Sequence, residues 1–394
     1  MRVLLVGMAD SVHVARWLAN LDQDTKVNIR ILPSSPHRKI HNGVQALLKT
    51  NGQVSVAINP FLGRFSLPIW LLDRIPIIDG RLRAWFLRRD IVKFQPHIVH
   101  IMETQNGGYP ALRAFESLER RSSSPCSPKV MLTLFGSDLF WFARFPRHEH
   151  KLRMLLPRID YLAAECHRDL EHASKLGFRG QFLPLSPVAA GVAASQISEA
   201  TSSGFSERRI VSVKGYGGRW GLGYKAIEAL GGMPGELSGY KVVIHSAERS
   251  TIRAAKKYLD PQGIEYEIFR KHELSHNQML ELLAKSRIYI GLSRSDGLPA
   301  SLLEAMSQGA FPIQTDSACT GGWITTGVTG EIVETENQHL VEFVATAIRK
   351  VMGNDKLVIT AALSNIELVR RKYSLDSTSS AVRWSYQNLT NDRP

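Results

Sequence analysis

Residues 293–309 read SRSDGLPASLLEAMSQG, and this stretch decides the fold because it marks the start and the end of one helix. The apolar run 288–292 before it predicts a buried strand. Pro299 is a favoured first residue of a helix, and Gly309 is a typical helix stop. A second apolar run at 311–314 predicts the next strand. Strand, turn, helix and strand in this order indicate a layered α/β fold.

The start of that helix predicts an anion site. The free backbone N–H groups of residues 297–300 are expected to face a crevice at the end of the sheet, where the helix dipole favours a phosphate. Asp296 lies at the helix mouth, and Glu304 lies about one and a half turns further in, where it can accept hydrogen bonds from vicinal hydroxyls. The alternative is an ordinary sheet-packing helix in which Asp296 caps and Glu304 is solvated.

The string SxSDGLPxxLLEAMxxG resembles the Glu-x7-Glu signature of the retaining glycosyltransferases of family 4, with Asp296 in place of the first Glu. The resemblance implies that Asp296 lies by the donor sugar and Glu304 by the ribose of the nucleotide. The turn formed by Gly297, Leu298 and Pro299 would lie by the sugar and the phosphates. The resemblance also implies the GT-B architecture, an α/β fold of two Rossmann-like domains facing across a cleft.

The composition fits this class of protein. A chain of 394 residues is long enough for two domains, since single cores stop growing near ~250–300 residues. The excess of 49 basic over 36 acidic residues suits polyanionic partners such as nucleoside diphosphates, an anionic membrane surface or nucleic acid, and charge alone does not choose among them. Cys126, Cys166 and Cys319 are too few and too widely spaced for a disulfide framework or a structural zinc site, which favours a reducing compartment.

Strand-like and helix-like segments alternate twice along the chain. The series over residues 1–187 predicts an N-terminal Rossmann-like domain, which the resemblance implies to be the acceptor-binding domain. The Ala-, Ser- and Gly-rich residues 188–208 predict a linker. The series over 209–375 predicts a C-terminal Rossmann-like domain, which the resemblance implies to be the nucleotide-sugar-binding domain. Residues 376–394 predict a C-terminal helix, which in similar glycosyltransferases crosses back to the first domain.

The glycine-rich stretch KGYGGRWGLGYKAIEAL, residues 214–230, follows the first strand of the second domain. Glycines such as Gly215 let the backbone approach a phosphate, and the cations Lys214 and Arg219 can neutralise a departing diphosphate. Related glycosyltransferases carry an Arg and a Lys at this place. Lys225 is the other candidate for the second cation, but it should lie inside the next helix. A surface loop with solvated cations is the alternative.

The same glycines suggest a rival, because Gly215, Gly217 and Gly221 loosely imitate a dinucleotide-binding fingerprint. Their spacing is G-x-G-x-x-x-G, and no acidic residue ends the next expected strand, 242–245, which is followed by Ser246. Both features disfavour a nicotinamide-dependent oxidoreductase.

The first domain offers three candidates. The string TLFGSDL, residues 133–139, resembles the HGSDL-like element of family 4 enzymes, with Phe135 where many of them have His. Asp138 is a candidate catalytic or sugar-binding residue, and a helix N-cap is the equally weighted alternative. Gly7 ends the first strand, where it can approach the donor phosphates. His13 is a candidate acceptor-binding residue, although a lone His on an amphipathic helix is more often packed or on the surface.

Three further segments bear on membranes and metals. Residues 61–78 are apolar and aromatic, and the basic stretch 80–94 includes Arg81, Arg88 and Arg89, so peripheral contact with an anionic membrane is one interpretation. Packing of the apolar face on the sheet is the other. Asp22 and Asp24 form an isolated Asp-x-Asp without the convergent oxygen ligands of a metal site, so no metal is expected.

The resemblance therefore implies an enzyme that transfers a hexosyl group, with retention, from a nucleoside diphosphate sugar to a hydroxyl of a glycan or glycolipid. The resemblance implies no metal or other cofactor, no protein base and no nucleic-acid partner. It points to bacterial-type cell-envelope polysaccharide biosynthesis in the cytoplasm, with the inner face of the cell membrane as an open alternative. A nucleotide-sugar epimerase, an NAD-dependent oxidoreductase and a non-enzymatic sugar- or nucleic-acid-binding protein remain rivals.

Overall fold

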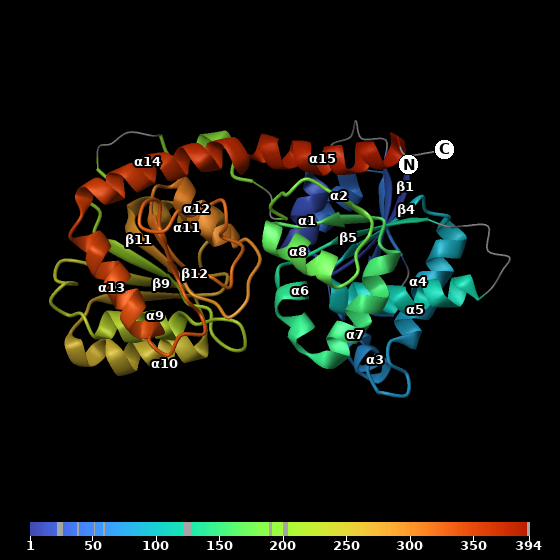
Figure 1. The fold of residues 1–394 in the computed structure, drawn as a ribbon, viewed down its shortest axis with the longest axis horizontal. Helices are drawn as coiled ribbons and strands as arrows, with labels where there is room; N and C mark the ends of the chain where they lie inside the picture. Colours follow the sequence, from blue (N-terminus) through green and yellow to red (C-terminus); the bar gives the residue numbers. More distant parts are fainter. Residues whose placement is uncertain are drawn as a thin grey trace. The chain divides into compact units, whose positions relative to one another are not determined.

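The computed structural model describes residues 1–21, 27–37, 39–50, 52–57, 60–120, 128–188, 191–199 and 204–391. Asp22, Asp24, Cys126 and the linker residues 189–190 and 200–203 lie outside these ranges. The chain divides into two compact units (Figure 1). Unit 1 comprises Met1–Ala190 and Thr378–Pro394, and unit 2 comprises Gly191–Ser377.

Unit 1 is built on a parallel sheet with the strand order β3-β2-β1-β4-β5-β6-β7. The strands are β1 (Arg2–Gly7), β2 (Asn28–Pro33), β3 (Val54–Val56), β4 (Ile98–Met102), β5 (Lys129–Thr133), β6 (Tyr161–Ala163) and β7 (Gln181–Phe182). Successive side chains of β1 enter different cores, because side chains alternate across a strand. Leu4 and Val6 belong to one buried cluster, whereas Val3 and Leu5 belong to the other. The sheet is therefore covered on both faces.

Helices supply the covering layers of unit 1 (Figure 1). They are α1 (Val12–Ala19), α2 (Asn42–Thr50), α3 (Ser66–Asp73), α4 (Arg81–Phe94), α5 (Tyr109–Glu119), α6 (Ser137–Phe140), α7 (Pro146–Leu155) and α8 (His167–Lys175), and a π-helical turn, Thr104–Gly108, precedes α5. Within the described ranges, no helix combines the length and the apolar composition that crossing a bilayer requires.

The C-terminal helix α15 (Leu375–Asn391) contributes to the core of unit 1. The Tyr386 hydroxyl lies 3.1 Å from Trp17 Nε1 and 2.6 Å from His100 Nδ1. His100 Nε2 in turn lies 2.8 Å from the Thr133 hydroxyl oxygen. Burial lowers the pKa of His100 to about 3, so the imidazole is neutral. Tyr386 then donates to Nδ1 while Nε2 donates to Thr133, and each group in this chain is satisfied.

Unit 2 repeats the layered plan around a parallel sheet with the order β10-β9-β8-β11-β12-β13. Its strands are β8 (Ile210–Lys214), β9 (Lys241–Ala247), β10 (Tyr266–Arg270), β11 (Ser286–Gly291), β12 (Phe311–Thr315) and β13 (Glu331–Val333). Its helices are α9 (Gly223–Gly231), α10 (Arg249–Tyr258), α11 (His276–Lys285), α12 (Ala300–Ser307), α13 (Leu340–Met352) and α14 (Asp355–Lys372). Figure 1 shows these helices on both faces of the sheet.

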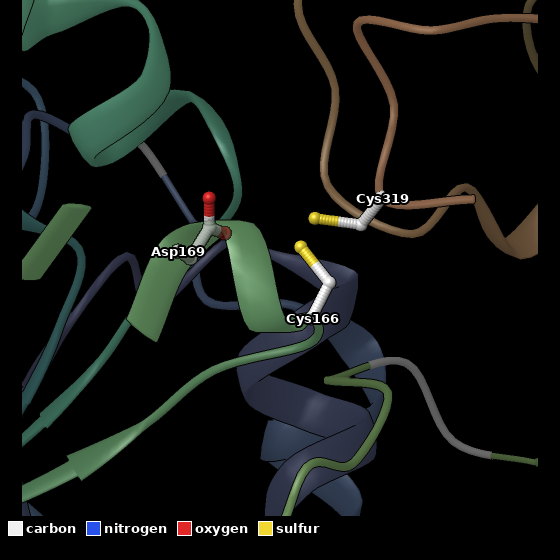
Figure 2. A group of neighbouring side chains, drawn as sticks. All are labelled: Cys166, Asp169 and Cys319. Atoms are coloured by element: carbon white, nitrogen blue, oxygen red, sulfur yellow. The ribbon is translucent and has the colours of Figure 1, made fainter. Parts of the chain in front are cut away.

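Two of the three cysteines lie in described segments. Cys166 is the N-cap of α8 in unit 1, and Asp169 lies in the first turn of that helix (Figure 2). Burial raises the pKa of Asp169 to about 6, although the neighbouring Arg168 opposes this shift. Cys319 lies in unit 2, in the segment after β12, where its backbone N–H donates to the Gly297 carbonyl at 2.9 Å.

Candidate functional site

Two segments that the sequence singled out meet in unit 2. The glycine bend, residues 215–223, follows β8, and the acidic turn, residues 292–299, follows β11. These strands are neighbours in the sheet, so their carboxyl ends share one edge. A bridge joins Gly221 to Ser293, and the Leu222 N–H donates to the Leu292 carbonyl at 3.0 Å. The fold therefore holds the glycine bend directly against the acidic turn.

Glycine is required at two positions of the bend by close backbone contacts. A Cβ on Gly215 would lie 2.7 Å from the Ala247 Cα, and a Cβ on Gly221 would lie 2.2 Å from the Tyr216 carbonyl carbon. Any side chain at either place would displace backbone atoms. The bend is thus fixed in a compact form by its own contacts, in addition to any role in approaching a phosphate.

The Lys214 and Asp296 side chains form an ion pair at this edge, with Nζ 3.2 Å from Oδ2. Lys214 is buried, whereas about a third of the Asp296 side chain, 32%, is exposed. Burial opposes the charge of Lys214, but the nearby Asp296 carboxylate, followed by Tyr289 and Tyr216, leaves the pKa of Lys214 above its ordinary value. Lys214 is therefore a fixed cation at the carboxyl edge of the sheet.

The start of α12 differs from the predicted one. Pro299 is the N-cap, with φ −67° and ψ 123°, and the helix begins at Ala300. Proline has no N–H, and the Gly297 N–H already donates to Asp296 Oδ1 at 3.0 Å. The expectation of free N–H groups throughout 297–300 was therefore wrong. The donors left without an intrahelical acceptor are those of the first turn of α12, beginning at Ala300 and Ser301.

Glu304 is buried in the second turn of α12, with 7% of the residue exposed. Its Oε1 lies 3.1 Å from Nε2 of His276, the first residue of α11. A solvated Glu304, the alternative that the sequence left open, does not fit this burial. A buried carboxylate needs hydrogen-bond partners, and His276 supplies one.

Tyr289, a buried residue of β11, lies near Lys214, Asp296 and Glu304. Its hydroxyl lies 2.8 Å from the Ser301 hydroxyl, in the first turn of α12. Burial raises the pKa of Tyr289 to about 12; the Lys214 charge opposes this shift, while Asp296 and Glu304 add to it. The buried phenol of Tyr289 is thus electrostatically coupled to Lys214, Asp296 and Glu304. No sequence pattern pointed to Tyr289, which reads as an ordinary apolar position in a buried strand, or to the pairing of His276 with Glu304.

The two candidates for a second cation lie in different surroundings. Arg219 is exposed on the glycine bend, and its guanidinium carbon lies 5.2 Å from the centre of the Trp220 ring. Lys225 lies inside α9, as predicted, and its Nζ pairs with Glu228 at 2.9 Å. Glu228 therefore already neutralises Lys225, whereas Arg219 presents its charge to solvent.

One argument against dinucleotide binding was wrong. The strand β9 does not end at His245 but continues to Ala247, through Ser246 with φ 52°. Glu248 follows the strand, and its backbone N–H donates to the Gly215 carbonyl at 2.9 Å. An acidic residue therefore stands beside the glycine bend, where a dinucleotide-binding fold places one.

The candidates of unit 1 lie at the carboxyl ends of its strands. Gly7 is the last residue of β1, and a Cβ there would lie 3.3 Å from Val14 Cγ2 of α1. His13 lies in the first turn of α1, with its ring centre 5.6 Å from that of Phe135. The fold thus places the rings of His13 and Phe135 next to each other.

Asp138 is an anchor for two loops. It is 2% exposed, and Oδ1 accepts hydrogen bonds from the backbone and the hydroxyl of Thr104 at 2.7 and 2.6 Å. Oδ2 accepts from the Phe135 N–H at 2.6 Å. Burial raises the pKa of Asp138, and these hydrogen bonds oppose the shift. Both carboxylate oxygens thus have partners within the protein, and Asp138 connects the two loops.

Glu103, which the sequence did not single out, follows β4 with φ 78°, an uncommon conformation for a residue with a side chain. Its Oε1 accepts from the N–H groups of Asn106 and Gly107 at 2.7 and 3.0 Å. Burial, together with the charge of Asp138, raises the pKa of Glu103 to about 8.

Part of the chain is similar in sequence to one family of known proteins. Residues 239–358, from just before β9 to the start of α14, match the family model described as Glycosyl transferases group 1. No curated protein matches the chain in sequence.

Solved structures match nearly the whole chain. The Anabaena protein HepE in complex with UDP-glucose has a TM-score of 0.65 at 11% identity, covering 98% of this chain and 100% of that one. Sucrose-phosphate synthase from Thermosynechococcus elongatus has a TM-score of 0.71 at 10% identity over 100% of both chains. The lipopolysaccharide outer core galactosyltransferase WaaB, in its apo form, has 0.65 at 16% identity over 99% of both. The predicted fold class, two Rossmann-like α/β units as in GT-B glycosyltransferases, is confirmed.

Proposed function

We propose that the chain is a retaining glycosyltransferase that moves a hexosyl group from a nucleoside diphosphate sugar to a hydroxyl of a glycan or glycolipid. The observation that carries the proposal is the Lys214–Asp296 pair beside the amino end of α12, with Glu304 buried on the same helix. The group 1 match over residues 239–358 supports it, since this region contains Asp296 and Glu304.

In this proposal each group of unit 2 has one role. Lys214, Arg219 and the first N–H groups of α12 stabilise the negative charge that develops on the diphosphate as its bond to the sugar breaks. Glu304 accepts hydrogen bonds from the ribose hydroxyls, with His276 holding the carboxylate in place. Asp296 orients the sugar. Its ion pair with Lys214 weakens when the diphosphate binds, because Lys214 then pairs with the diphosphate.

The chemistry needs no protein base in this scheme. The bond between the anomeric carbon and the diphosphate oxygen breaks, and the acceptor oxygen bonds to the same face of that carbon. The diphosphate leaves with the electron pair and takes the acceptor proton. HepE was solved in complex with UDP-glucose, which makes that compound the first donor to test on this chain.

Donor hydrolysis across UDP, GDP and ADP sugars tests the proposal. We expect at least one of these donors to be turned over, with the same anomer of the free sugar formed first as in the donor. Glu304→Gln should weaken nucleotide binding by about 1–3 kcal/mol, because a charge-assisted hydrogen bond is lost. Glu281→Gln, on the exposed side of α11, is the matched control and should leave binding unchanged. Unchanged nucleotide affinity in the Glu304 variant would contradict the ribose assignment.

A second candidate function is favoured by one observation, the position of Glu248 beside the glycine bend. A nicotinamide-dependent oxidoreductase would use that carboxylate on a ribose hydroxyl. Fluorescence titration with NADH decides between the two: binding that Glu248→Gln abolishes would favour the oxidoreductase. A nucleotide-sugar epimerase, the other rival, would convert the donor sugar into its epimer without any acceptor.

A further inference from the structure

A cluster of exposed apolar side chains, here called the α3 apolar surface, lies between residues 65 and 77 of unit 1. Its members and their exposed fractions are Phe65 (66%), Leu67 (53%), Leu71 (55%), Leu72 (50%), Ile75 (43%) and Ile77 (82%). Single exposed apolar residues are ordinary on a folded protein, but a contiguous group of this kind marks a binding surface.

The helix α3 directs apolar side chains toward solvent and polar side chains toward the protein. It buries its polar residues Ser66 and Asp73, and it exposes Leu67, Leu71 and Leu72. A helix that packs on a core does the reverse. The next helix, α4, follows the ordinary rule, because its apolar residues Ala84, Leu87 and Ile91 are buried in the core. The basic stretch 80–94 therefore packs its apolar face on the core through α4, whereas the apolar segment 61–78 exposes apolar side chains on α3.

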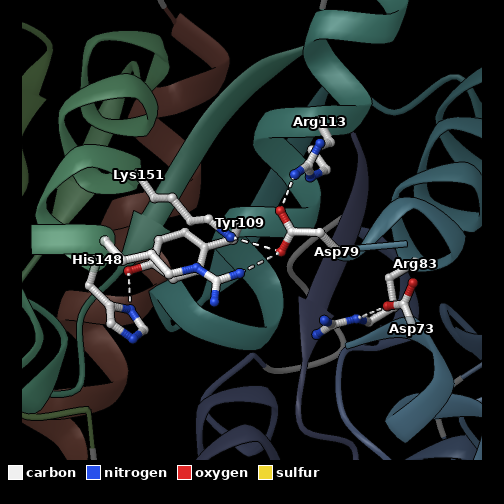
Figure 3. Close-up of polar contacts among 8 residues, drawn as sticks. Asp73, Asp79, Arg83, Tyr109, Arg113, His148 and Lys151 are labelled. Atoms are coloured by element: carbon white, nitrogen blue, oxygen red, sulfur yellow. Dashed lines mark hydrogen bonds and ion pairs between the residues drawn. The ribbon is translucent and has the colours of Figure 1, made fainter. Parts of the chain in front are cut away.

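Asp73 fixes this orientation. Its side chain is fully buried, and it accepts a hydrogen bond from the Leu82 N–H of α4 at 2.8 Å. It also accepts one from Nε of Arg83, on the same helix, at 2.5 Å (Figure 3). Its backbone carbonyl accepts from the Gly80 N–H at 2.7 Å. The end of α3 is thus bound to the start of α4 by side-chain and backbone contacts, which hold the leucines toward solvent.

Asp79 fixes the turn between the two helices. It adopts φ 38°, and its carboxylate pairs with Arg113 of α5, with Lys151 Nζ at 3.2 Å and with Arg147 at 3.3 Å (Figure 3). The burial of Asp79 favours its neutral form, but Lys151 and Arg113 outweigh this effect and hold its pKa below the usual range. One carboxylate thus faces three cations from α5 and α7, so the surroundings of the turn carry an excess of positive charge.

More cations lie in α3's own segment and on the two helices that follow it. Arg74 lies in the same segment, with its guanidinium 4.5 Å from the centre of the Trp70 ring. A groove of about 550 Å³ between α4 and α5 begins at Arg81, directly after the turn, and its charged lining also includes Arg88, Arg113, Arg120 and Glu116. Trp85, which is 48% exposed, lines the same groove. Exposed apolar side chains on one helix and several arginines on the next two have the composition of a membrane-surface site.

We infer that the α3 apolar surface binds the face of an anionic lipid bilayer. Its apolar side chains enter the interface, while Arg74 and the arginines of the groove contact headgroup phosphates. Charge complementarity selects a bilayer over a second copy of this chain, because a second copy carries the same net charge of +13 and the same arginines. Binding at this surface does not depend on the proposed function, since it involves residues of unit 1 alone.

Sedimentation with lipid vesicles tests the inference on the full chain. We expect binding to phosphatidylcholine vesicles that contain phosphatidylglycerol, and weak binding to phosphatidylcholine alone. The triple variant Leu71→Gln, Leu72→Gln and Ile77→Gln should bind the anionic vesicles at least about tenfold more weakly, since each apolar side chain contributes to interfacial transfer. Arg81→Gln with Arg88→Gln should abolish the preference for anionic vesicles.

Two controls keep the outcome interpretable. Phe343→Gln removes a large side chain of similar exposure, 46%, from unit 2 and should leave vesicle binding unchanged. The single variant Ile77→Gln changes the most exposed member and should still reduce binding if the triple variant fails to fold. Equal sedimentation of the triple variant and the unchanged chain would overturn the inference. So would a lack of vesicle binding by the unchanged chain, or light scattering in which these substitutions dissolve an oligomer without affecting vesicle binding.

Discussion

Replacing Lys214 with Met tests the donor half of the proposed site most sharply. Methionine retains most of the apolar stem of the side chain and removes the charge that lies 3.2 Å from Asp296. A hydrogen bond to a charged group contributes about 1.5–3 kcal/mol, so nucleoside diphosphate binding should weaken roughly 10- to 100-fold. The fold should lose little, on the order of 1 kcal/mol, because Asp296 is partly exposed and water can take the place of the cation.

Lys225→Met is the matched control for this experiment. Lys225 lies only eleven positions further along the chain, in the same glycine-rich stretch, but it is paired with Glu228 within α9. Its loss should change the nucleotide affinity by less than about threefold, because Glu228 already neutralises Lys225. The fold should lose only ~0.3–0.5 kcal/mol, as is usual for a pair on a helix surface. Calorimetric titration with the nucleoside diphosphate measures both variants, and thermal unfolding checks the fold. Equal effects of the two substitutions, or full affinity in the Lys214 variant, would refute the assignment.

Three further outcomes are expected. Asp296→Asn should tighten nucleoside diphosphate binding by roughly two- to fivefold in calorimetry while slowing sugar transfer, because the carboxylate no longer competes for Lys214; weaker binding would contradict this. In the unfolded chain the Glu103 carboxyl has its ordinary pKa of 4.5, whereas in the folded chain its pKa is about 8. Between these two pH values only the folded chain keeps the proton, so the free energy of unfolding falls as pH rises through this window. Glu103→Gln should remove this loss, at most about 1.4 kcal/mol per pH unit, and a pH-independent difference in urea unfolding would count against it. Tyr386→Phe should destabilise unit 1 by about 1–3 kcal/mol in urea unfolding, because it leaves the buried His100 without a donor, and an equally stable variant would exclude that role.

The sequence predicted the elements that depend on local patterns. The apolar runs around Ile288 and Phe311, and Gly309 as a helix stop, predicted the strand-helix-strand unit with boundaries within about two residues of those observed. The short strands β3, β7 and β13 had no such signal, because two or three residues cannot establish a period. The end of β9 was also not predicted, because Ser246 adopts a positive φ that no local sequence pattern indicates.

Side-chain direction was harder to predict than position. Asp138 follows its strand as expected, but its carboxylate turns inward to Thr104, a residue 34 positions away. Lys214 and Asp296 are 82 positions apart, so only the pairing of β8 with β11 brings them together. The outward-facing leucines of α3 depend in the same way on Asp73 and its contacts with α4. These features are set by tertiary contacts, which composition and periodicity do not contain.

A crystal structure of the chain with the best-binding nucleoside diphosphate sugar tests the proposed donor site most directly. We expect the diphosphate at the amino end of α12, within hydrogen-bond distance of the Ala300 N–H and of Lys214 Nζ, with the ribose hydroxyls on Glu304. A nucleotide bound elsewhere on the chain, or a Glu304 that still pairs with His276 and does not touch the ribose, would contradict the proposal.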